Sequence, residues 1–202
     1  TLPAEGSVSA FVTIMQGCDN YCAFCVVPYL RGREESRGFE DILAEVNALA
    51  ARGVKEVTLL GQNVNAYGKS FGGKHTFAQL LRAIGAVPGI GRVRFTTSHP
   101  KDLSDDIIAC FREVKNLCES IHLPVQSGSD EVLARMNRRY TSADYLGRVR
   151  RLREASPEIA ITSDIIVGFP GEAEQDYQKT LDLMEKVRFD TVFSFQYSER
   201  QG

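Results

Sequence analysis

Strand-like and helix-like segments alternate along the whole of this 202-residue chain. Short apolar runs of strand length recur, and each is followed by a segment whose apolar residues keep helical spacing. The runs predict strands over residues 8–14, 54–60, 93–96, 121–125, 159–167 and 191–197. Because a helix separates successive strands, the strands must run parallel through right-handed crossovers. This pattern predicts an α/β fold, either a doubly wound sheet or a complete or partial barrel.

The predicted helices connect these strands without any break that would mark a domain boundary. They cover residues 39–52, 77–84, 129–136, 141–155 and 172–187, with a further helix that begins after a Ser104 cap. The sequence has no internal repeat, low-complexity tract or linker. We therefore expect residues 1–202 to form one domain.

Each predicted strand ends in a polar or glycine-rich segment. These ends are residues 17–18, 61–65, 98–100, 124–128, 168–172 and 197–200. The carboxyl ends of parallel strands meet at one edge, which is where ligands bind in both fold classes. The sequence therefore predicts a functional site at this edge.

The composition is that of a globular protein, with 43% hydrophobic and 25% charged residues, and it excludes a disordered or collagen-like chain. A net charge of −2 provides no general basic field, so a nucleic acid would have to bind a local patch. The chain has no apolar run of membrane-spanning length, and we expect no signal sequence. We expect a cytoplasmic protein without a membrane partner.

Three of the five cysteines, Cys18, Cys22 and Cys25, lie on one short loop after the first predicted strand. Thiolates bind zinc, copper(I) or iron-sulfur clusters. A structural zinc ion needs a fourth ligand, whereas a cubane cluster held by three cysteines keeps one iron open for another ligand. Cys110 and Cys118 do not form a second close pair and are expected in the core. The spacing alone still leaves zinc binding and simple packing open.

The cysteine loop and the strand ends together carry a family resemblance. The loop reads GCDNYCAFCVVPY over residues 17–29 and RGRE over 31–34. The later ends read LGQNVN over 60–65, TSHP over 97–100, HLPVQSGS over 122–129 and SDIIVGFPGE over 163–172. These motifs, which span nearly the whole chain, resemble the methylthiotransferases of the radical S-adenosylmethionine (SAM) superfamily. The resemblance is closer to the tRNA-modifying branch than to the branch that modifies a ribosomal protein.

The resemblance implies a partial (β/α)6 TIM-like barrel that serves as the radical SAM core domain over residues 1–202. It implies that Cys18, Cys22 and Cys25 are catalytic and hold a 4Fe-4S cluster whose open iron site binds SAM. Family members also have an N-terminal domain with a second 4Fe-4S cluster and a C-terminal β domain that binds RNA, and neither falls within this sequence. A monomer is expected, with an electron donor such as flavodoxin or ferredoxin.

The reaction implied by the resemblance begins with reductive cleavage of SAM. The radical produced removes hydrogen from C2 of N6-isopentenyladenosine next to the tRNA anticodon, and sulfur and methyl are then added to give the 2-methylthio derivative. Two alternatives remain: the same chemistry on a ribosomal protein side chain, or a non-enzymatic iron-sulfur or zinc module. A barrel that binds an unrelated phosphate ligand is a further possibility.

Further residues at the strand ends are expected to contact the cofactor. They are Phe24, Gly61, Gln62, Asn63, Ser98, Gln126, Ser127, Asp164, Ile166 and Gly168. Plainer interpretations exist, because Phe24 could pack in its loop, residues 61–63 could form a turn, and Ser127 could cap a helix. His99 and His122 are expected to be hydrogen-bonded structural residues rather than general bases.

A local basic patch is expected to bind tRNA despite the negative net charge. Its residues are Tyr29, Arg31, Arg33, Arg37, Arg138 and Arg139. Arginines suit RNA phosphates, and aromatic rings suit unstacked bases. For the arginines of residues 135–153, a solvated helix face is an equally good interpretation.

Overall fold

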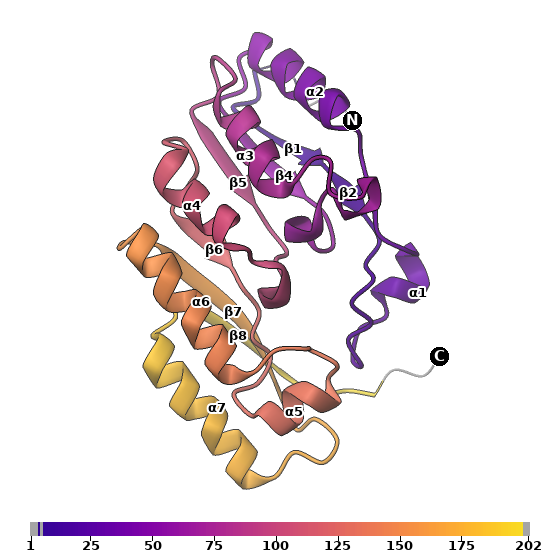
Figure 1. Cartoon of the computed structure of the whole chain (residues 1–202), viewed down its shortest axis with the longest axis vertical. Coiled ribbons are helices and arrows are strands. Elements are labelled where there is room, and N and C mark those ends of the chain that lie inside the picture. The colour runs from indigo at the N-terminus through magenta and orange to yellow at the C-terminus, as the bar shows by residue number, and fades with distance from the viewer. Residues whose placement is uncertain (1–3, 5, 200–202) are drawn as a thin grey trace.

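The computed structural model describes residues 4 and 6–199, in which helices cover the outer side of a curved series of parallel strands (Figure 1). The predicted α/β class is confirmed. The six predicted strands are β1 (Ser9–Thr13), β4 (Glu56–Leu60), β5 (Arg92–Phe95), β6 (Ser120–His122), β7 (Ala160–Val167) and β8 (Thr191–Gln196). Arg200, the last residue of the sixth predicted strand end, lies outside the described residues.

The strands form two parallel sheets that continue into each other. One has the order β1-β4-β5 and the other the order β6-β7-β8. A parallel bridge between Val93 and Leu117 joins them, with hydrogen bonds from Val93 N–H to the Asn116 carbonyl and from Cys118 N–H to the Val93 carbonyl. Within the described chain β1 and β8 form the outer edges and do not pair with each other. The predicted partial, six-unit barrel is therefore the observed one.

The long helices lie between successive strands, where the sequence predicts them. They are α2 (Phe39–Ala51), α3 (Phe77–Gly85), α4 (Asp105–Glu113), α6 (Ser142–Ala155) and α7 (Glu174–Val187). The side chains of Thr76, Ser104 and Thr141 accept backbone N–H groups at the starts of α3, α4 and α6, as N-caps do. None of the described helices has the length and hydropathy that crossing a membrane requires.

Helix α7 begins two residues later than predicted. The Glu172 carboxylate accepts the backbone N–H groups of Gly168 and Phe169, so this residue stabilises the preceding turn instead of the first turn of the helix. Helix α5 (Asp130–Arg135) matches its prediction, with Ser129 as the N-cap.

Several short elements were not predicted. They are β2 (Met15–Gln16), β3 (Glu35–Ser36), α1 (Val27–Arg31) and the 3-10 helices η1 (Val64–Ala66), η2 (Lys69–Phe71) and η3 (Pro100–Asp102). The antiparallel β2–β3 pair closes the base of the cysteine loop. Gly17 follows β2 with φ +72°, and a Cβ atom there would lie 1.9 Å from the Arg33 carbonyl oxygen. Only glycine fits this close approach.

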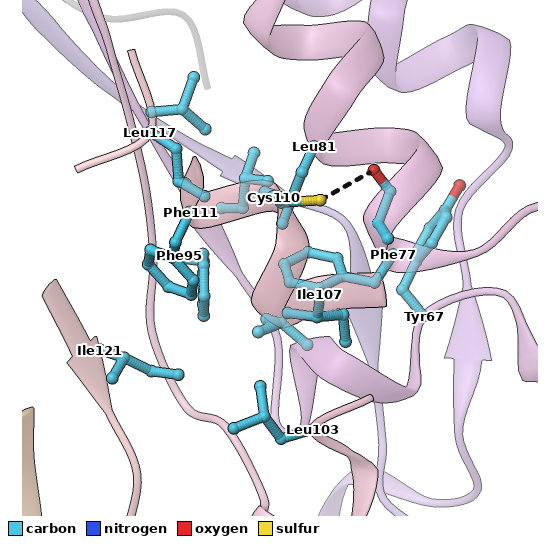
Figure 2. Close-up of a cluster of buried hydrophobic side chains, with 14 of the residues drawn as sticks. Tyr67, Phe77, Leu81, Phe95, Leu103, Ile107, Cys110, Phe111, Leu117 and Ile121 are labelled. Carbon is cyan, nitrogen blue, oxygen red and sulfur yellow. Dashed lines mark hydrogen bonds between the residues drawn. The ribbon is translucent and has the colours of Figure 1, made fainter. Parts of the chain in front are cut away.

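The core between the helices and the strands is built largely from aromatic and aliphatic side chains. Figure 2 shows Phe77, Phe95 and Phe111 gathered around α3 and α4, with ring centroids 5.1 Å apart for the first pair and 6.0 Å for the second. Cys110 is fully buried among them, and its Sγ lies 3.6 Å from the Ala78 carbonyl oxygen. Its predicted core position is confirmed, whereas Cys118 is only partly buried beside the sheet junction.

We predict that Phe77→Ala lowers the free energy of unfolding by about 3–5 kcal/mol, because it opens a cavity in a closely packed core. Phe77 is 1% exposed. Phe71→Ala is the matched control: Phe71 is 37% exposed, and its loss should cost about 1 kcal/mol or less. Urea denaturation of both variants measures the difference, and equal losses would contradict this account of the core.

Candidate active site

The cysteine loop lies at the predicted edge, between β2 and α1. Cys22 is buried, while Cys18 and Cys25 are partly exposed, and all three thiols are free. The loop is held by backbone hydrogen bonds from Cys18 N–H to the Gly32 carbonyl and from Cys25 N–H to the Cys22 carbonyl. Burial raises the pKa of Cys18, so this thiol is protonated at neutral pH. A metal ion that binds its sulfur has to displace this proton.

The turn over residues 136–138, which we call the clamp turn, fixes the cysteine loop from the opposite half of the barrel. Ala23 N–H donates to the Met136 carbonyl at 3.0 Å, and Asn137 Nδ2 donates to the carbonyls of Asn20 and Tyr21. Asn137 has φ +58°, a conformation that asparagine tolerates better than most residues. These hydrogen bonds hold the loop against the second half of the barrel.

Arg138 is the third residue of the clamp turn, and it is 4% exposed. Its Nη1 donates to Cys22 Sγ at 3.4 Å, its Nη2 to the Pro124 carbonyl at 2.6 Å, and its Nε to the Tyr140 hydroxyl at 2.9 Å. The structure thus places Arg138 against a cysteine of the loop and away from the surface where an RNA would bind.

His99, at the carboxyl end of β5, approaches the same thiol. Its Nδ1 accepts the Lys101 N–H at 3.1 Å, which assigns the ring proton to Nε2, and Nε2 lies 3.9 Å from Cys22 Sγ. Burial, with the nearby Arg138 cation, lowers the pKa of His99 to about 2, so the ring is neutral. His122 also has partners, Thr162 at 2.9 Å and Asp164 at 3.4 Å. Both histidines are hydrogen-bonded, as expected.

A cavity of about 460 Å³ opens beside the cysteine loop, a size typical of small-molecule sites. It brings together some of the predicted cofactor residues, namely Phe24, Gln126, Asp164 and Ile166, with residues 195–198 completing the wall. Gln126 has φ +72° in the segment that runs beside β7. Such strained backbone is found preferentially at functional sites.

Buried polar atoms without partners lie at the ends of β4 and β5. They are Gln62 Oε1, Asn63 Oδ1 and Ser98 Oγ. Asn63 Nδ2 donates to Asp102 at 2.7 Å, an orientation that leaves its Oδ1 free to accept. A buried acceptor without a donor costs free energy, which indicates that a ligand supplies the missing hydrogen bonds. The other such atoms in the described chain are Arg148 Nε and Glu172 Oε1.

Three further predicted cofactor residues have structural partners within the described chain. A Cβ atom on Gly61 would lie 2.5 Å from Met15 Cγ, so Gly61 permits close packing. Ser127 is fully buried, with its Oγ 3.3 Å from Thr180 Oγ1 on α7. Gly168, with φ +71°, donates its N–H to Glu172. The structure does not bring these three into the cavity lining.

A second cavity, of about 360 Å³, lies on the other side of the cysteine loop and is strongly charged. Its lining contains Asp19, Asn20, Arg33, Glu34, Lys69, Ser70, Lys101 and Arg139. Of the predicted RNA residues only Arg33 and Arg139 belong to it. Tyr29 is 79% exposed on α1, Arg31 ends the same helix, and Arg37 pairs with Glu45 at 2.8 Å.

Sequence reasoning missed Glu34, Lys69 and Lys101. They come from separate loops, and no local pattern links them. Both lysines bind the Asp102 carboxylate, at 2.6 and 2.8 Å, and these hydrogen bonds, with Asn63, outweigh its burial and lower the pKa of Asp102 to about 2. Asp102 is therefore ionised and holds the Asn63 amide in place.

Three thiols on one loop are a donor set that an iron-sulfur cluster with an open iron can use. Among the described side chains, no group of three His, Cys, Asp or Glu is arranged to hold a single metal ion. In a cluster each thiolate binds a different iron, so three cysteines along one loop suffice. Hydrogen bonds to a sulfur that binds such a cluster are a common means of tuning it, and Arg138 and His99 both reach Cys22 Sγ.

Comparison with known proteins identifies the family of this chain. A model of the radical SAM superfamily matches residues 12–184, and the chain therefore belongs to that superfamily. The chain is 60% identical over 201 residues to the tRNA-2-methylthio-N(6)-dimethylallyladenosine synthase of Syntrophus aciditrophicus (strain SB), covering 100% of this chain and 44% of that protein. The synthase of the same name from Geotalea uraniireducens (strain Rf4) is 62% identical over 193 residues, or 96% and 44% of the two chains. The chain thus spans less than half the length of these relatives.

Solved structures share the fold at low sequence identity. A radical S-adenosylmethionine methyltransferase from Kitasatospora setae superposes with a TM-score of 0.74 at 19% identity, over 92% of this chain and 36% of that one. Coproporphyrinogen III oxidase from Escherichia coli gives a TM-score of 0.65 at 14% identity, over 95% and 44%. The predicted radical SAM type of partial barrel is confirmed.

We predict that the wild type loses stability between pH 5 and pH 8 and that Glu34→Gln reduces this loss. Burial raises the pKa of Glu34 from 4.5 to about 7, with Asp102 and Asp19 adding to the shift and Lys69 and Lys101 opposing it. Between these two pKa values the folded state keeps the proton on Glu34, whereas the unfolded state has lost it. The free energy of unfolding therefore falls as the pH rises through this range. Because Glu34 is only partly buried, the effect should be about 1–2 kcal/mol.

Urea denaturation of the wild type and Glu34→Gln at both pH values measures this effect. Glu35→Gln, an exposed carboxyl on the neighbouring residue, is the control. An identical pH dependence for the wild type and Glu34→Gln would show that Glu34 is ionised throughout.

Proposed function

We propose that this chain is the catalytic core of a radical SAM enzyme that methylthiolates N6-isopentenyladenosine next to the tRNA anticodon. The observation that carries the proposal is the loop with Cys18, Cys22 and Cys25 beside a cavity that Phe24 of the same loop lines. Identity of about 60% to synthases of this reaction, across the whole chain, supports the choice of substrate. Because the chain spans 44% of those relatives, the complete activity is a proposal for the protein as a whole.

The three cysteines would hold a 4Fe-4S cluster with one open iron site. When bound, such a cluster supplies the electron that cleaves SAM to the radical that starts the reaction. The chain's own task is to orient SAM: the amide oxygens of Gln62 and Asn63 lack donors, and an ammonium group supplies donors. Ser98 Oγ, also without a partner, would bind another polar group of SAM.

The cavity of about 460 Å³ would take the adenosine part of SAM and the adenine to be modified. Phe24 and Ile166 supply apolar wall, and Gln126 and Asp164 supply hydrogen-bonding groups. Phe24 and Ile166 also pack against a buried group formed by Val132, Met136 and Phe169, which gives this wall a firm base. A wall of this kind keeps a radical away from water and from other side chains.

We propose that the charged cavity and the neighbouring surface bind the tRNA backbone. Arg33 and Arg139 line the cavity, and Arg139 forms no ion pair with a carboxylate among the described residues. Tyr29 presents an exposed ring, 6.2 Å from the ring of Tyr21, on which a loop base could stack. Arg31 and Arg37 extend this surface, while Arg138 is not retained because it is buried.

The remaining expectations form part of the same proposal. Residues 1–202 are the core domain, and a second 4Fe-4S cluster and an RNA-binding β domain belong to segments outside this sequence. We propose a cytoplasmic monomer that takes electrons from a flavodoxin or ferredoxin, because tRNA and these donors occur together there. We expect no direct cofactor contact from Gly61, Ser127 and Gly168. Their effect on the cofactor would come from the packing and turns that shape the strand ends.

We predict that anaerobic reconstitution with iron and sulfide loads a cluster that, after dithionite reduction, converts SAM to 5′-deoxyadenosine. Cys22→Ala should abolish both loading at this site and product formation, because each thiolate binds its own iron. Cys118→Ala, a partly buried cysteine outside the loop, is the matched control and should keep both. Iron analysis and chromatography of the product are the measurements.

The outcomes separate the alternatives. Preferential zinc binding without cluster formation would contradict the proposal. A loaded cluster with no SAM cleavage would indicate an electron carrier, and methylthio transfer to a ribosomal protein in place of tRNA would assign the other substrate.

We predict that Arg139→Ala weakens tRNA binding and lowers the slope of log affinity against log salt by about one, because one phosphate contact is lost. Arg150→Ala is the control, since Arg150 is exposed on α6 and pairs with Glu154. Filter binding over a range of salt concentrations gives the slope. Equal slopes for Arg139→Ala and the wild type would place the RNA surface elsewhere.

A further inference from the structure

Arg138 is a buried cation with no carboxylate as a partner. It is 4% exposed, and within the described chain it forms no ion pair with an aspartate or glutamate. Arginine is rarely buried unless its charge is balanced, because removing an ion from water is costly. The three atoms that accept its hydrogen bonds are the Pro124 carbonyl oxygen, the Tyr140 hydroxyl and Cys22 Sγ.

Of these three groups only Cys22 can carry the balancing negative charge. A carbonyl is neutral, and burial raises the pKa of Tyr140 above its ordinary value, so the phenol stays protonated. The Tyr140 ring lies 5.3 Å from the guanidinium carbon and offsets part of the charge, but a ring carries no net charge. The negative charge that balances Arg138 therefore comes from a Cys22 thiolate or from an anionic group bonded to that sulfur.

We infer that Arg138 is a positioning residue for the cluster: its guanidinium balances the charge of the cluster-bound Cys22 thiolate and makes reduction of the cluster easier. The inference rests on the proposed function, because it requires a cluster on the cysteine loop. Three thiolates give such a cluster a net negative charge, and reduction adds one more electron. A fixed cation at hydrogen-bond distance from a ligating sulfur stabilises the reduced form more than the oxidised form.

The planar fork of Arg138 also explains how the charge is held in place. Nη2 is bound to the Pro124 carbonyl and Nε to the Tyr140 hydroxyl, which leaves Nη1 aimed at Cys22. Tyr140 is fixed in turn by its own hydrogen bond to the Val125 carbonyl at 2.8 Å. A lysine has one nitrogen and cannot bind all three acceptors in this way. Arg138 thus links the segment after β6 to the cysteine loop, over a sequence separation of 116 residues.

His99 supports the same thiol from the other half of the barrel. Its Nδ1 accepts the Lys101 N–H, so its Nε2–H, 3.9 Å from Cys22 Sγ, is a second donor that faces this sulfur. The two donors come from the end of β5 and from the clamp turn. Cys22 Sγ is therefore oriented before any iron is bound, whereas Cys18 and Cys25 have only backbone hydrogen bonds to hold them.

The test compares Arg138→Met, which removes the charge, with Arg138→Lys, which keeps it. Arg153→Met is the matched control, because Arg153 Nη2 also donates to a backbone carbonyl, that of Val187, but lies on α6 away from the loop. The purified protein is reconstituted with iron and sulfide. The midpoint potential is measured by electron paramagnetic resonance during a redox titration, on the signal that changes when SAM is added. Melting temperatures are measured with and without the cluster.

We expect Arg138→Met to shift the midpoint potential to more negative values and Arg138→Lys to shift it less, while Arg153→Met leaves it unchanged. We also expect Arg138→Met to lower the melting temperature more in the cluster-loaded protein than in the iron-free protein. An unchanged potential together with equal losses of melting temperature in both forms would show that Arg138 only supports the fold, and would overturn the inference.

Two further outcomes are kept distinct. If Arg138→Met does not fold, Arg138→Gln replaces it, and equal potentials for the Gln and Lys variants contradict the inference. If the wild type itself binds no cluster, the proposed function fails and the inference, which requires a cluster on the cysteine loop, is overturned with it.

Discussion

The clamp turn over residues 136–138 joins the cysteine loop to the second half of the barrel, and the geometry of the site depends on this contact. Met136 and Asn137 bind the loop backbone, and Arg138 binds the Cys22 thiol and the Pro124 carbonyl together. The loop itself has little regular structure beyond the two-residue β2–β3 pair. Without the clamp turn, the loop would keep its own backbone hydrogen bonds, the pair of Asp19 with Arg33 and the contact of His99 with Cys22.

The site also needs polar groups that meet at one edge, and the partial barrel brings them together. Parallel strands bring Asn63 and Ser98 to the ends of β4 and β5, and Asp164 lies on β7 where it lines the cavity. Asn63 Oδ1 and Ser98 Oγ are buried without partners, and Gln126 is held in a strained backbone conformation. Each costs stability in the absence of a ligand. A core of close-packed aromatic and aliphatic side chains offsets this cost on the outer side of the strands.

The strands, the long helices and the edge that carries the site could be predicted from the sequence, since each rests on local periodicity or on a cap such as Thr141. The two-residue β2 and β3 have no periodicity and were missed. Arg138 was expected on the surface, as most arginines are, because its burial depends on Cys22, which lies 116 residues away. The convergence of Lys69 and Lys101 on Asp102 is likewise a long-range contact, and no local pattern reveals it.

The central claim is that three thiols of one loop hold a cluster with an iron left open for SAM. Mössbauer spectroscopy of the protein reconstituted with isotopically enriched iron tests this claim directly, with and without SAM. The account predicts a cluster spectrum in which one iron site changes when SAM is added while the other sites do not. A spectrum of isolated iron, or a cluster spectrum that SAM leaves unchanged, would contradict it.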